Sequence, residues 1–213
     1  MLDYQKEFIQ YALDCGVLKF GEFQLKSGRM SPYFFNTGLF DTGAKLGKLG
    51  EFYARALLES TLDIDMLFGP AYKGIPLVSA TSIAYARLTG RDMPFAFNRK
   101  EAKDHGEGGV IVGTPLSGNV LILDDVITAG TSVRESVVII NGANACPAGV
   151  LIALDRQEKG PDGQSATQEV RQTYNMPVQS IVSLEQIIEY LKTVQDRRYP
   201  VDAIIEYRKQ YGI

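Results

Sequence analysis

One stretch carries most of the information about the fold, Asn119-Val120-Leu121-Ile122-Leu123-Asp124-Asp125-Val126-Ile127-Thr128-Ala129-Gly130-Thr131-Ser132. Its apolar run, 120–123, is uninterrupted, as in a strand that helices cover on both faces. Two carboxylates and a loop of small residues follow, and the apolar spacing over Val133–Asn141 then predicts a helix. In a sheet of parallel strands, ligands bind at the carboxyl ends of the strands. We therefore expect the functional site just after residue 123.

The loop after this strand has the chemistry of a phosphate site. Its backbone N–H groups, its hydroxyls and the positive end of the following helix all suit a dianion. The residues concerned are Thr128, Ala129, Gly130, Thr131 and Ser132. Asp124 and Asp125 would repel a phosphate, but they can accept hydrogen bonds from sugar hydroxyls or hold a hydrated Mg²⁺ ion. Together these groups predict a ribose 5-phosphate ligand.

The rest of the chain alternates short apolar runs with helical patterns, which predicts an α/β fold with parallel strands and crossover helices. The expected strands are Met66–Gly69, Pro94–Asn98, Val120–Asp124 and Val150–Asp155, and the expected helices between them are Ile75–Leu88 and Val133–Asn141. Further helices are expected at Tyr4–Asp14, Ala44–Ser60, Ser183–Val194 and Val201–Tyr211, and a small β-rich cap with a turn at Lys26–Arg29 is expected within 17–39. The polar stretches 99–109 and 157–168 lack apolar periodicity and are predicted loops.

Composition excludes several classes of protein. With 22 Lys and Arg against 25 Asp and Glu, the net charge of -3 does not favour a nucleic-acid surface. The single histidine, His105, and the two distant cysteines, Cys15 and Cys146, cannot build a histidine or thiolate metal site. Met1–Ile9 is too charged for a secretory signal, and glycine, proline and asparagine interrupt the run Ser136–Leu154, so neither export nor a membrane span is expected. A cytoplasmic protein is the expectation.

Two further segments suit anions. The turn Pro70–Gly74 leads from a strand into a helix, and its Lys73 is expected to face a pyrophosphate group. The stretch Arg99–Gly109 places Arg99, Lys100, Lys103 and His105 between glycines that can act as hinges.

These segments together resemble a known family. The stretch 119–132 is similar to the phosphoribosyl pyrophosphate signature of the type I phosphoribosyltransferases. The pattern Arg-Lys-x-x-Lys-x-His-Gly-x-Gly from Arg99 resembles the mobile catalytic loop of the orotate phosphoribosyltransferases of bacterial type. The resemblance extends over nearly the whole chain and includes Lys26, the pair Phe34-Phe35 and Leu154-Asp155-Arg156.

The resemblance implies the type I phosphoribosyltransferase fold, with a central mainly parallel sheet flanked by helices. It implies a single domain, 1–213, with a core of about 44–182 and a small N-terminal hood, mainly 1–40 with C-terminal contributions. The implied enzyme is a glycosyltransferase (a pentosyltransferase) that uses Mg²⁺ to transfer the 5-phosphoribosyl group from phosphoribosyl pyrophosphate to orotate. The products, orotidine 5'-phosphate and pyrophosphate, place the reaction in pyrimidine (UMP) biosynthesis. A homodimer is also implied, in which the mobile loop, 99–109, serves the neighbouring site.

The resemblance assigns residues to each part of the reaction. Lys103, His105, Asp124 and Asp125 are the implied catalytic residues, and Mg²⁺ is held mainly by the substrate, with the two aspartates acting through water. Donor binding is assigned to Lys26, Tyr72, Lys73, Arg99, Lys100, Lys103, His105, Asp124, Asp125 and 128–132, and orotate binding to Lys26, Phe34, Phe35, Thr128 and Arg156. Two alternatives remain open, which are transfer to another base and a regulator that binds phosphoribosyl pyrophosphate without catalysis.

Overall fold

The sheet at the centre of the protein has six strands. The computed structural model describes residues 1–25, 27–103, 109–128, 130–194, 196 and 198–213, without the side chains of 102 and 103. The strands, in sheet order, are β5 (Gly109–Gly113), β4 (Phe95–Lys103), β3 (Met66–Gly69), β6 (Asn119–Asp124), β7 (Cys146–Asp155) and β8 (Val178–Ser183). All neighbours are parallel except β4 and β5, which pair antiparallel. The predicted α/β class and mainly parallel sheet are confirmed.

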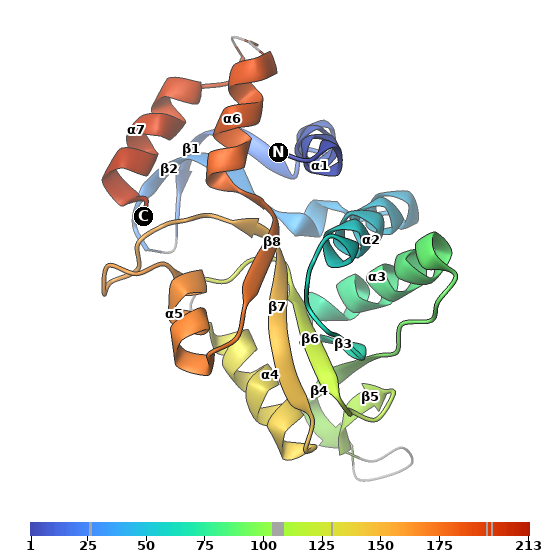
Figure 1. The fold of residues 1–213 in the computed structure, drawn as a ribbon. Helices are drawn as coiled ribbons and strands as arrows, with labels where there is room; N and C mark the ends of the chain where they lie inside the picture. Colours follow the sequence, from blue (N-terminus) through green and yellow to red (C-terminus); the bar gives the residue numbers. More distant parts are fainter. Residues whose placement is uncertain (26, 104–108, 129, 195, 197) are drawn as a thin grey trace.

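Helices cover both faces of this sheet (Figure 1). On one face lie α2 (Gly43–Leu58) and α3 (Gly74–Thr89), and on the other lie α4 (Thr131–Gly142) and α5 (Ala166–Tyr174). The side chains of β6 alternate between the two layers, because Leu121 and Leu123 belong to the core with α2 and α3, whereas Val120 and Ile122 belong to the core with α4. All four are fully buried, which confirms the central strand predicted from the apolar run.

A second, two-stranded sheet lies beyond the carboxyl edge of the first (Figure 1). Its strands, β1 (Leu18–Gln24) and β2 (Met30–Phe35), pair antiparallel, as the predicted turn between them requires. The helices α1 (Asp3–Asp14), α6 (Leu184–Val194) and α7 (Val201–Tyr211) surround this hairpin, and the 3-10 helix η1 (Thr37–Leu39) connects β2 to α2. The buried side chains of the hairpin and of these helices belong to the same hydrophobic cluster as Leu121. The chain therefore has one continuous core on this side of the large sheet.

Four elements differ from the sequence-based expectation. Residues 99–103, predicted as loop, extend β4, because Lys103 pairs with Gly109 in an antiparallel hairpin that satisfies the backbone without any apolar periodicity. The strand β5 completes this hairpin and was not predicted. The predicted loop 157–168 ends early because Ser165 caps α5 through the backbone N–H of Gln168. The edge strand β8 was also missed, since only part of its length is buried. Among the described residues, no helix is both long and apolar enough to cross a membrane.

Candidate active site

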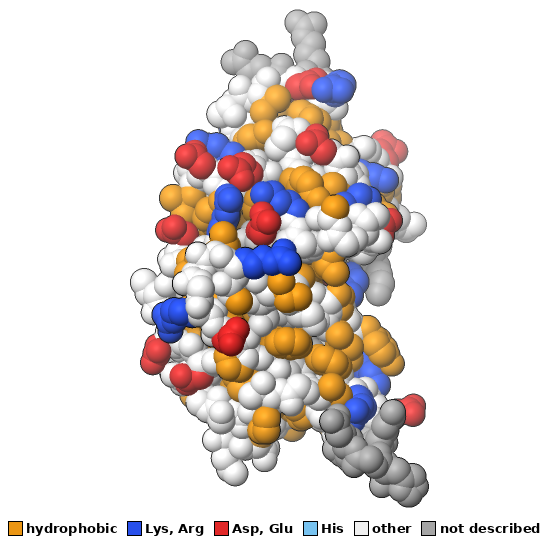
Figure 2. All heavy atoms as spheres, turned by 90° about the vertical axis from the view of Figure 1, so that its right-hand side faces the viewer, with side chains coloured by type: hydrophobic (Ala, Val, Ile, Leu, Met, Phe, Trp, Pro, Cys, Tyr) orange, Lys and Arg blue, Asp and Glu red, His pale blue; other side chains and the backbone are white. Residues whose placement is uncertain are grey.

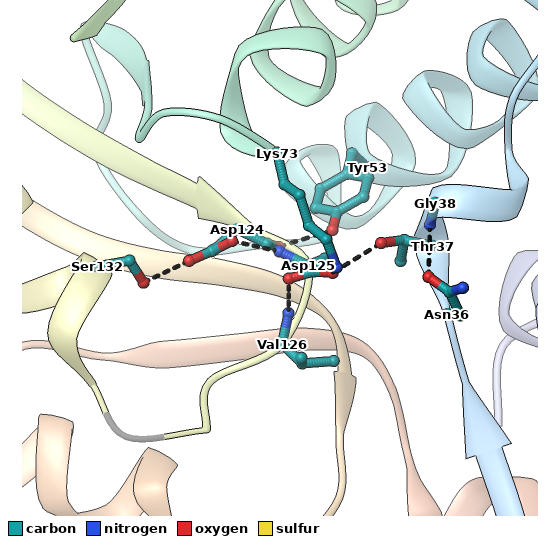
Figure 3. A network of polar contacts seen from close by, with 9 residues as sticks. All are labelled: Asn36, Thr37, Gly38, Tyr53, Lys73, Asp124, Asp125, Val126 and Ser132. Atoms are coloured by element: carbon teal, nitrogen blue, oxygen red, sulfur yellow. Dashed lines mark hydrogen bonds and ion pairs between the residues drawn. The ribbon is translucent and has the colours of Figure 1, made fainter. Parts of the chain in front are cut away.

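Asp124 and Asp125 lie side by side at the carboxyl end of β6, and both are buried (Figure 3). The Asp124 carboxylate accepts hydrogen bonds from the Ser132 hydroxyl at 2.6 Å and from the Asp125 backbone N–H at 2.8 Å. The buried Tyr53 hydroxyl donates to the backbone oxygen of Asp124 at 2.8 Å. The end of the strand is therefore fixed from both helical layers, by Tyr53 of α2 and Ser132 of α4.

The environment of Asp124 changes its acidity. Burial raises the pKa of the Asp124 carboxyl to about 6, against the lowering effect of the Ser132 hydrogen bond, and the nearby Asp125 carboxylate raises it further. The group thus gains and loses a proton at a pH where an exposed aspartate is fully ionised. A buried carboxylate at the carboxyl end of a strand is suited to accept hydrogen bonds from hydroxyl groups of a ligand.

Asp125 joins three parts of the chain. Its Oδ2 accepts a hydrogen bond from the Thr37 hydroxyl at 2.7 Å and pairs with the Lys73 ammonium at 2.5 Å (Figure 3). Its Oδ1 accepts the backbone N–H of Val126 at 2.9 Å. The side chain of Lys73 is still 58 % exposed. The Lys73 side chain is therefore accessible to an anionic ligand that binds beside the carboxylates.

The predicted phosphate loop lies directly after these carboxylates and ends at the N-terminus of α4. Gly130 is the residue before the helix, and its φ of 65° is left-handed. A Cβ there would touch only Val170, at 3.6 Å, so conformation rather than space favours glycine. Thr128 and Thr131 are exposed beside it. Ala129 lies outside the described residues.

The turn 70–74 packs tightly between β3 and α3. A Cβ on Gly69 would lie 2.2 Å from the Gly74 backbone oxygen. The backbones at the two ends of the turn therefore approach so closely that only glycine fits at position 69. Asn98, buried on β4, accepts a hydrogen bond from the Ala71 backbone N–H at 2.9 Å. The side chain of Tyr72 is exposed. The predicted anion-binding turn thus stands at the same edge of the sheet as the two aspartates.

Arg156 follows the end of β7, the neighbour of β6, and so reaches the same edge. Its Nε and Nη2 donate to one oxygen of Glu158, at 2.9 and 2.7 Å. The guanidinium carbon lies 4.9 Å from the centre of the Tyr33 ring. The side chain of Arg156 is 21% exposed, and these contacts hold it in a defined orientation, unlike a solvated surface residue.

The pair Phe34-Phe35 is divided between the two faces of β2. Phe35 is buried, and its ring meets that of Phe8 edge to face at 6.4 Å. Phe34 is 38 % exposed and stacks on Phe23 at 5.4 Å. Successive strand residues point to opposite faces, so a flat ligand can lie against only one of the two rings. The contact of this pair with the pyrimidine stays a prediction, with the Phe34 ring as the more exposed of the two.

The cationic stretch is described only in part. Lys100 on β4 pairs with Glu135 of α4 at 3.4 Å. Arg99 donates to the Gly109 oxygen at 3.3 Å, across the hairpin. The structure gives the backbone of Lys103, while Lys26 and His105 lie outside the described residues. Arg99, Lys100 and Lys103 therefore lie on the β4–β5 hairpin, and Asn98 of the same hairpin contacts the turn 70–74.

Four residues with a place in this site were not predicted from the sequence, namely Thr37, Tyr53, Asn98 and Glu158. Thr37 and Tyr53 contact Asp125 and the backbone of Asp124 from distant segments, Asn98 contacts the backbone of the turn 70–74, and Glu158 contacts Arg156 from two positions away along the chain. Asn98 and Glu158 each follow an apolar strand run, and that position was the available signal. Thr37 and Tyr53 carry no local signal, because one follows the β1–β2 hairpin and the other lies on the buried face of a helix.

The side chains of this site can bind Mg²⁺ only if a ligand supplies further oxygen atoms. Within the described part of the chain, no group of three or more histidine, cysteine, aspartate or glutamate side chains could hold a metal. Asp124 and Asp125 offer carboxylate oxygens, and Mg²⁺ in proteins is commonly bound through one or two carboxylates, water and substrate phosphates. The residues present therefore suit a magnesium ion that arrives with a phosphorylated substrate.

Comparison with known proteins decides the family. The phosphoribosyl transferase domain matches residues 40–181, which include both aspartates and the loop after them. The orotate phosphoribosyltransferase of Methylococcus capsulatus is 60% identical over 212 residues, covering 100% of this chain and 99% of that protein. This chain belongs to the orotate phosphoribosyltransferase family.

Other members agree along the full length. The orotate phosphoribosyltransferase of Pseudomonas aeruginosa is 60% identical over 213 residues, covering 100% of both chains. The crystal structure of the orotate phosphoribosyltransferase of Francisella tularensis has a TM-score of 0.88 and 48% identity, and it covers 97% of this chain and 100% of that one. The resemblance found in the sequence is confirmed. Because the matches extend beyond 40–181, family membership includes the β1–β2 hairpin and the last two helices.

Proposed function

We propose that this chain transfers the 5-phosphoribosyl group of phosphoribosyl pyrophosphate to orotate, with Mg²⁺, and releases orotidine 5'-phosphate and pyrophosphate. The observation that carries the proposal is the arrangement at the end of β6. There, two buried carboxylates are followed by a loop that enters α4 at Gly130, in a chain 60% identical to orotate phosphoribosyltransferases over its whole length. This arrangement combines acceptors for ribose hydroxyls with donors for a phosphate.

The donor would bind along the carboxyl edge of the sheet. Its 5-phosphate fits the loop 128–132 and the N-terminus of α4, and its ribose hydroxyls fit Asp124 and Asp125. Its pyrophosphate fits the exposed ammonium of Lys73 in the turn 70–74, together with Tyr72. We assign the remaining cations to the same group, namely Lys26, Arg99, Lys100, Lys103 and His105.

Orotate would bind between the donor and the β1–β2 hairpin. Its planar carboxylate matches the guanidinium edge of Arg156, because two N–H groups can bind two oxygens in one plane. Lys26, Thr128 and the Phe34-Phe35 segment complete the proposed site. The exposed ring of Phe34, rather than the buried ring of Phe35, is available as a contact for the pyrimidine.

In the reaction, the bond from the anomeric carbon to pyrophosphate breaks while a bond from the same carbon to a ring nitrogen of orotate forms. Positive charge develops on the ribose, close to the two carboxylates that hold its hydroxyls. Mg²⁺, when bound with the donor, neutralises charge on the departing pyrophosphate. Lys73, Lys103 and His105 would stabilise the same anion, with Lys103 and His105 as candidates for proton donation to it.

We further propose that two copies of this chain form the working enzyme, with the stretch 99–109 of one copy serving the site of the other. A groove of about 610 Å³ lies between α2 and α3, and Ile83 and Leu88 on that side are 53 % and 46 % exposed. Figure 2 shows hydrophobic side chains among the charged ones on the face that contains these helices. Such a face supports an interface between copies.

The decisive experiment mixes the purified protein with Mg²⁺, phosphoribosyl pyrophosphate and orotate and follows the absorbance of orotate. The proposal expects orotate to be consumed only when the donor and Mg²⁺ are both present. Asp124→Asn/Asp125→Asn is the control, which should keep the fold and lose the turnover. Turnover of another base such as uracil or a purine, without turnover of orotate, would contradict the proposal. Donor binding without turnover of any base would support a regulator instead.

A further inference from the structure

Glu158 binds the Arg156 side chain through two hydrogen bonds. The two residues lie two positions apart after β7, and the side chains of Glu158 and Arg156 are 15% and 21% exposed, respectively. Both Nε and Nη2 of the arginine donate to the same carboxylate oxygen, Oε1. The pair therefore uses the side edge of the guanidinium and fixes the plane of the group.

Tyr33 of β2 holds this pair from the opposite side. Its hydroxyl donates to the same Oε1 of Glu158 at 2.9 Å, and its ring lies under the Arg156 guanidinium. Burial raises the pKa of the Tyr33 phenol well above its ordinary value, so the hydroxyl remains a donor at any physiological pH. One glutamate oxygen thus collects three hydrogen bonds, two from Arg156 and one from Tyr33.

The backbone of Glu158 is fixed as well. Residues 157–159 pair with residues 211–213, because the Lys159 N–H donates to the Tyr211 oxygen at 2.8 Å and the Ile213 N–H donates to the Gln157 oxygen at 3.0 Å. Glu158 is therefore held by its backbone and by its side chain, and it can serve as a rigid support for its neighbour.

The support leaves one edge of Arg156 available. The guanidinium has five N–H donors, and Glu158 uses the side edge made by Nε and one hydrogen of Nη2. Within the described residues, Nη1 makes no hydrogen bond. The end edge, made by Nη1 and the second hydrogen of Nη2, has the two parallel donors that a planar carboxylate requires.

We infer that Glu158, fixed by Tyr33, is a positioning residue that presents the end edge of Arg156 to the carboxylate of the pyrimidine substrate. The inference rests on the proposed function, and it explains how the site would select orotate over a pyrimidine without a carboxylate. Uracil has the same ring as orotate without the carboxylate, so a fixed guanidinium favours orotate. Glu158 also carries a negative charge close to the substrate carboxylate, which by itself weakens binding. Its positioning effect and its charge therefore act in opposite directions.

This opposition allows a sharp test. In Glu158→Gln, the amide oxygen can still accept the three hydrogen bonds while the charge is removed, so kcat/KM for orotate should stay within about threefold of wild type or rise. In Glu158→Ala, the support is lost, and kcat/KM for orotate should fall by about tenfold or more, with the KM for phosphoribosyl pyrophosphate little changed. The kcat/KM of Tyr33→Phe for orotate should lie between the values of these two variants.

Two variants serve as matched controls. Glu206→Ala removes an exposed glutamate of α7 that pairs with Lys209 at 2.6 Å, and Tyr190→Phe removes a hydroxyl that donates to Gln10 at 2.7 Å. Neither residue contacts Arg156, so both variants should keep the wild-type kcat/KM for orotate.

A double-mutant cycle separates positioning from a general structural role. If Glu158 acts through Arg156, then Glu158→Ala should cause no further fall in an Arg156→Ala protein. Equal falls in both backgrounds, or an unchanged kcat/KM for orotate in Glu158→Ala, would overturn the inference. If Glu158→Ala does not fold, the same cycle with Tyr33→Phe decides in the same way. A wild-type protein that does not consume orotate would overturn the proposed function itself, which is a different result.

Discussion

Replacing Asp124 by asparagine should stabilise the protein at neutral pH while removing its activity. The native carboxyl keeps its proton up to a pKa of about 6, because it is buried, whereas the unfolded chain loses the proton near 3.8. Between these values the native state binds more protons than the unfolded state, so stability falls as pH rises. When both states are ionised, the cost of the buried charge reaches about 3 kcal/mol. The asparagine variant has no such cost.

The other interactions of this side chain change little with pH. Asparagine can still accept the Asp125 backbone N–H through its oxygen, and its amide can donate to the Ser132 hydroxyl oxygen. Any constant difference from these hydrogen bonds is of the order of 1 kcal/mol. The dependence on pH therefore isolates the effect of the charge. From about pH 4.5 to about pH 7.5, the stability of the variant relative to wild type should increase by about 2 kcal/mol.

The assay is urea denaturation at several pH values, without Mg²⁺ or substrate. Circular dichroism or tyrosine fluorescence can follow it, since the chain has no tryptophan. Asp162→Asn is the control, because Asp162 is exposed, and its stability difference from wild type should be nearly constant with pH. A difference for Asp124→Asn that is constant or shrinks as pH rises would refute the reasoning from burial.

Three other substitutions test the proposed site. Arg156→Ala should raise the KM for orotate by a factor of about 10 to 150, because a charge-assisted hydrogen bond is lost. The KM for phosphoribosyl pyrophosphate should change little, and steady-state kinetics with each substrate varied in turn would measure both values. Asn98→Ala leaves the Ala71 N–H without its partner, so it should lower the free energy of unfolding by about 1 to 3 kcal/mol and raise the KM for the donor more than that for orotate. Mixing Lys103→Ala subunits with Asp124→Asn/Asp125→Asn subunits should restore about half the wild-type activity per mixed dimer, because one site then receives both defects and the other receives neither. No recovery on mixing would mean that each loop serves its own subunit.

The elements with strong local patterns could be predicted from the sequence. The central strand, the helices α2, α3 and α4, and the loop that enters α4 all lie within a few residues of the predicted limits, whereas α5 was not predicted. Asp124 and Asp125 were predicted at a functional edge because a buried strand in a parallel sheet defines that edge without any long-range information.

The rest depends on pairing between distant segments. The β4–β5 hairpin is polar and was predicted as a loop, since backbone pairing rather than side-chain burial holds it. The Thr37 hydroxyl reaches Asp125 across 88 residues of sequence, and the Tyr33 hydroxyl reaches Glu158 across 125. No local periodicity reports such contacts. The separation of Phe34 from Phe35 was not predicted, although adjacent residues of a strand point to opposite faces.

The ion pair between Lys73 and Asp125 has a consequence for how the donor is chosen. A ligand that draws Lys73 away through a phosphate leaves a buried carboxylate without its cation, which costs free energy. Phosphoribosyl pyrophosphate can compensate, because its ribose hydroxyls can donate to the carboxylate that its pyrophosphate has uncovered. Free pyrophosphate or sulfate has no ribose hydroxyl to donate to this carboxylate. Under the proposed function, this exchange of partners at Asp125 would couple recognition of the pyrophosphate to recognition of the ribose in one molecule and would disfavour simple anions at the same turn.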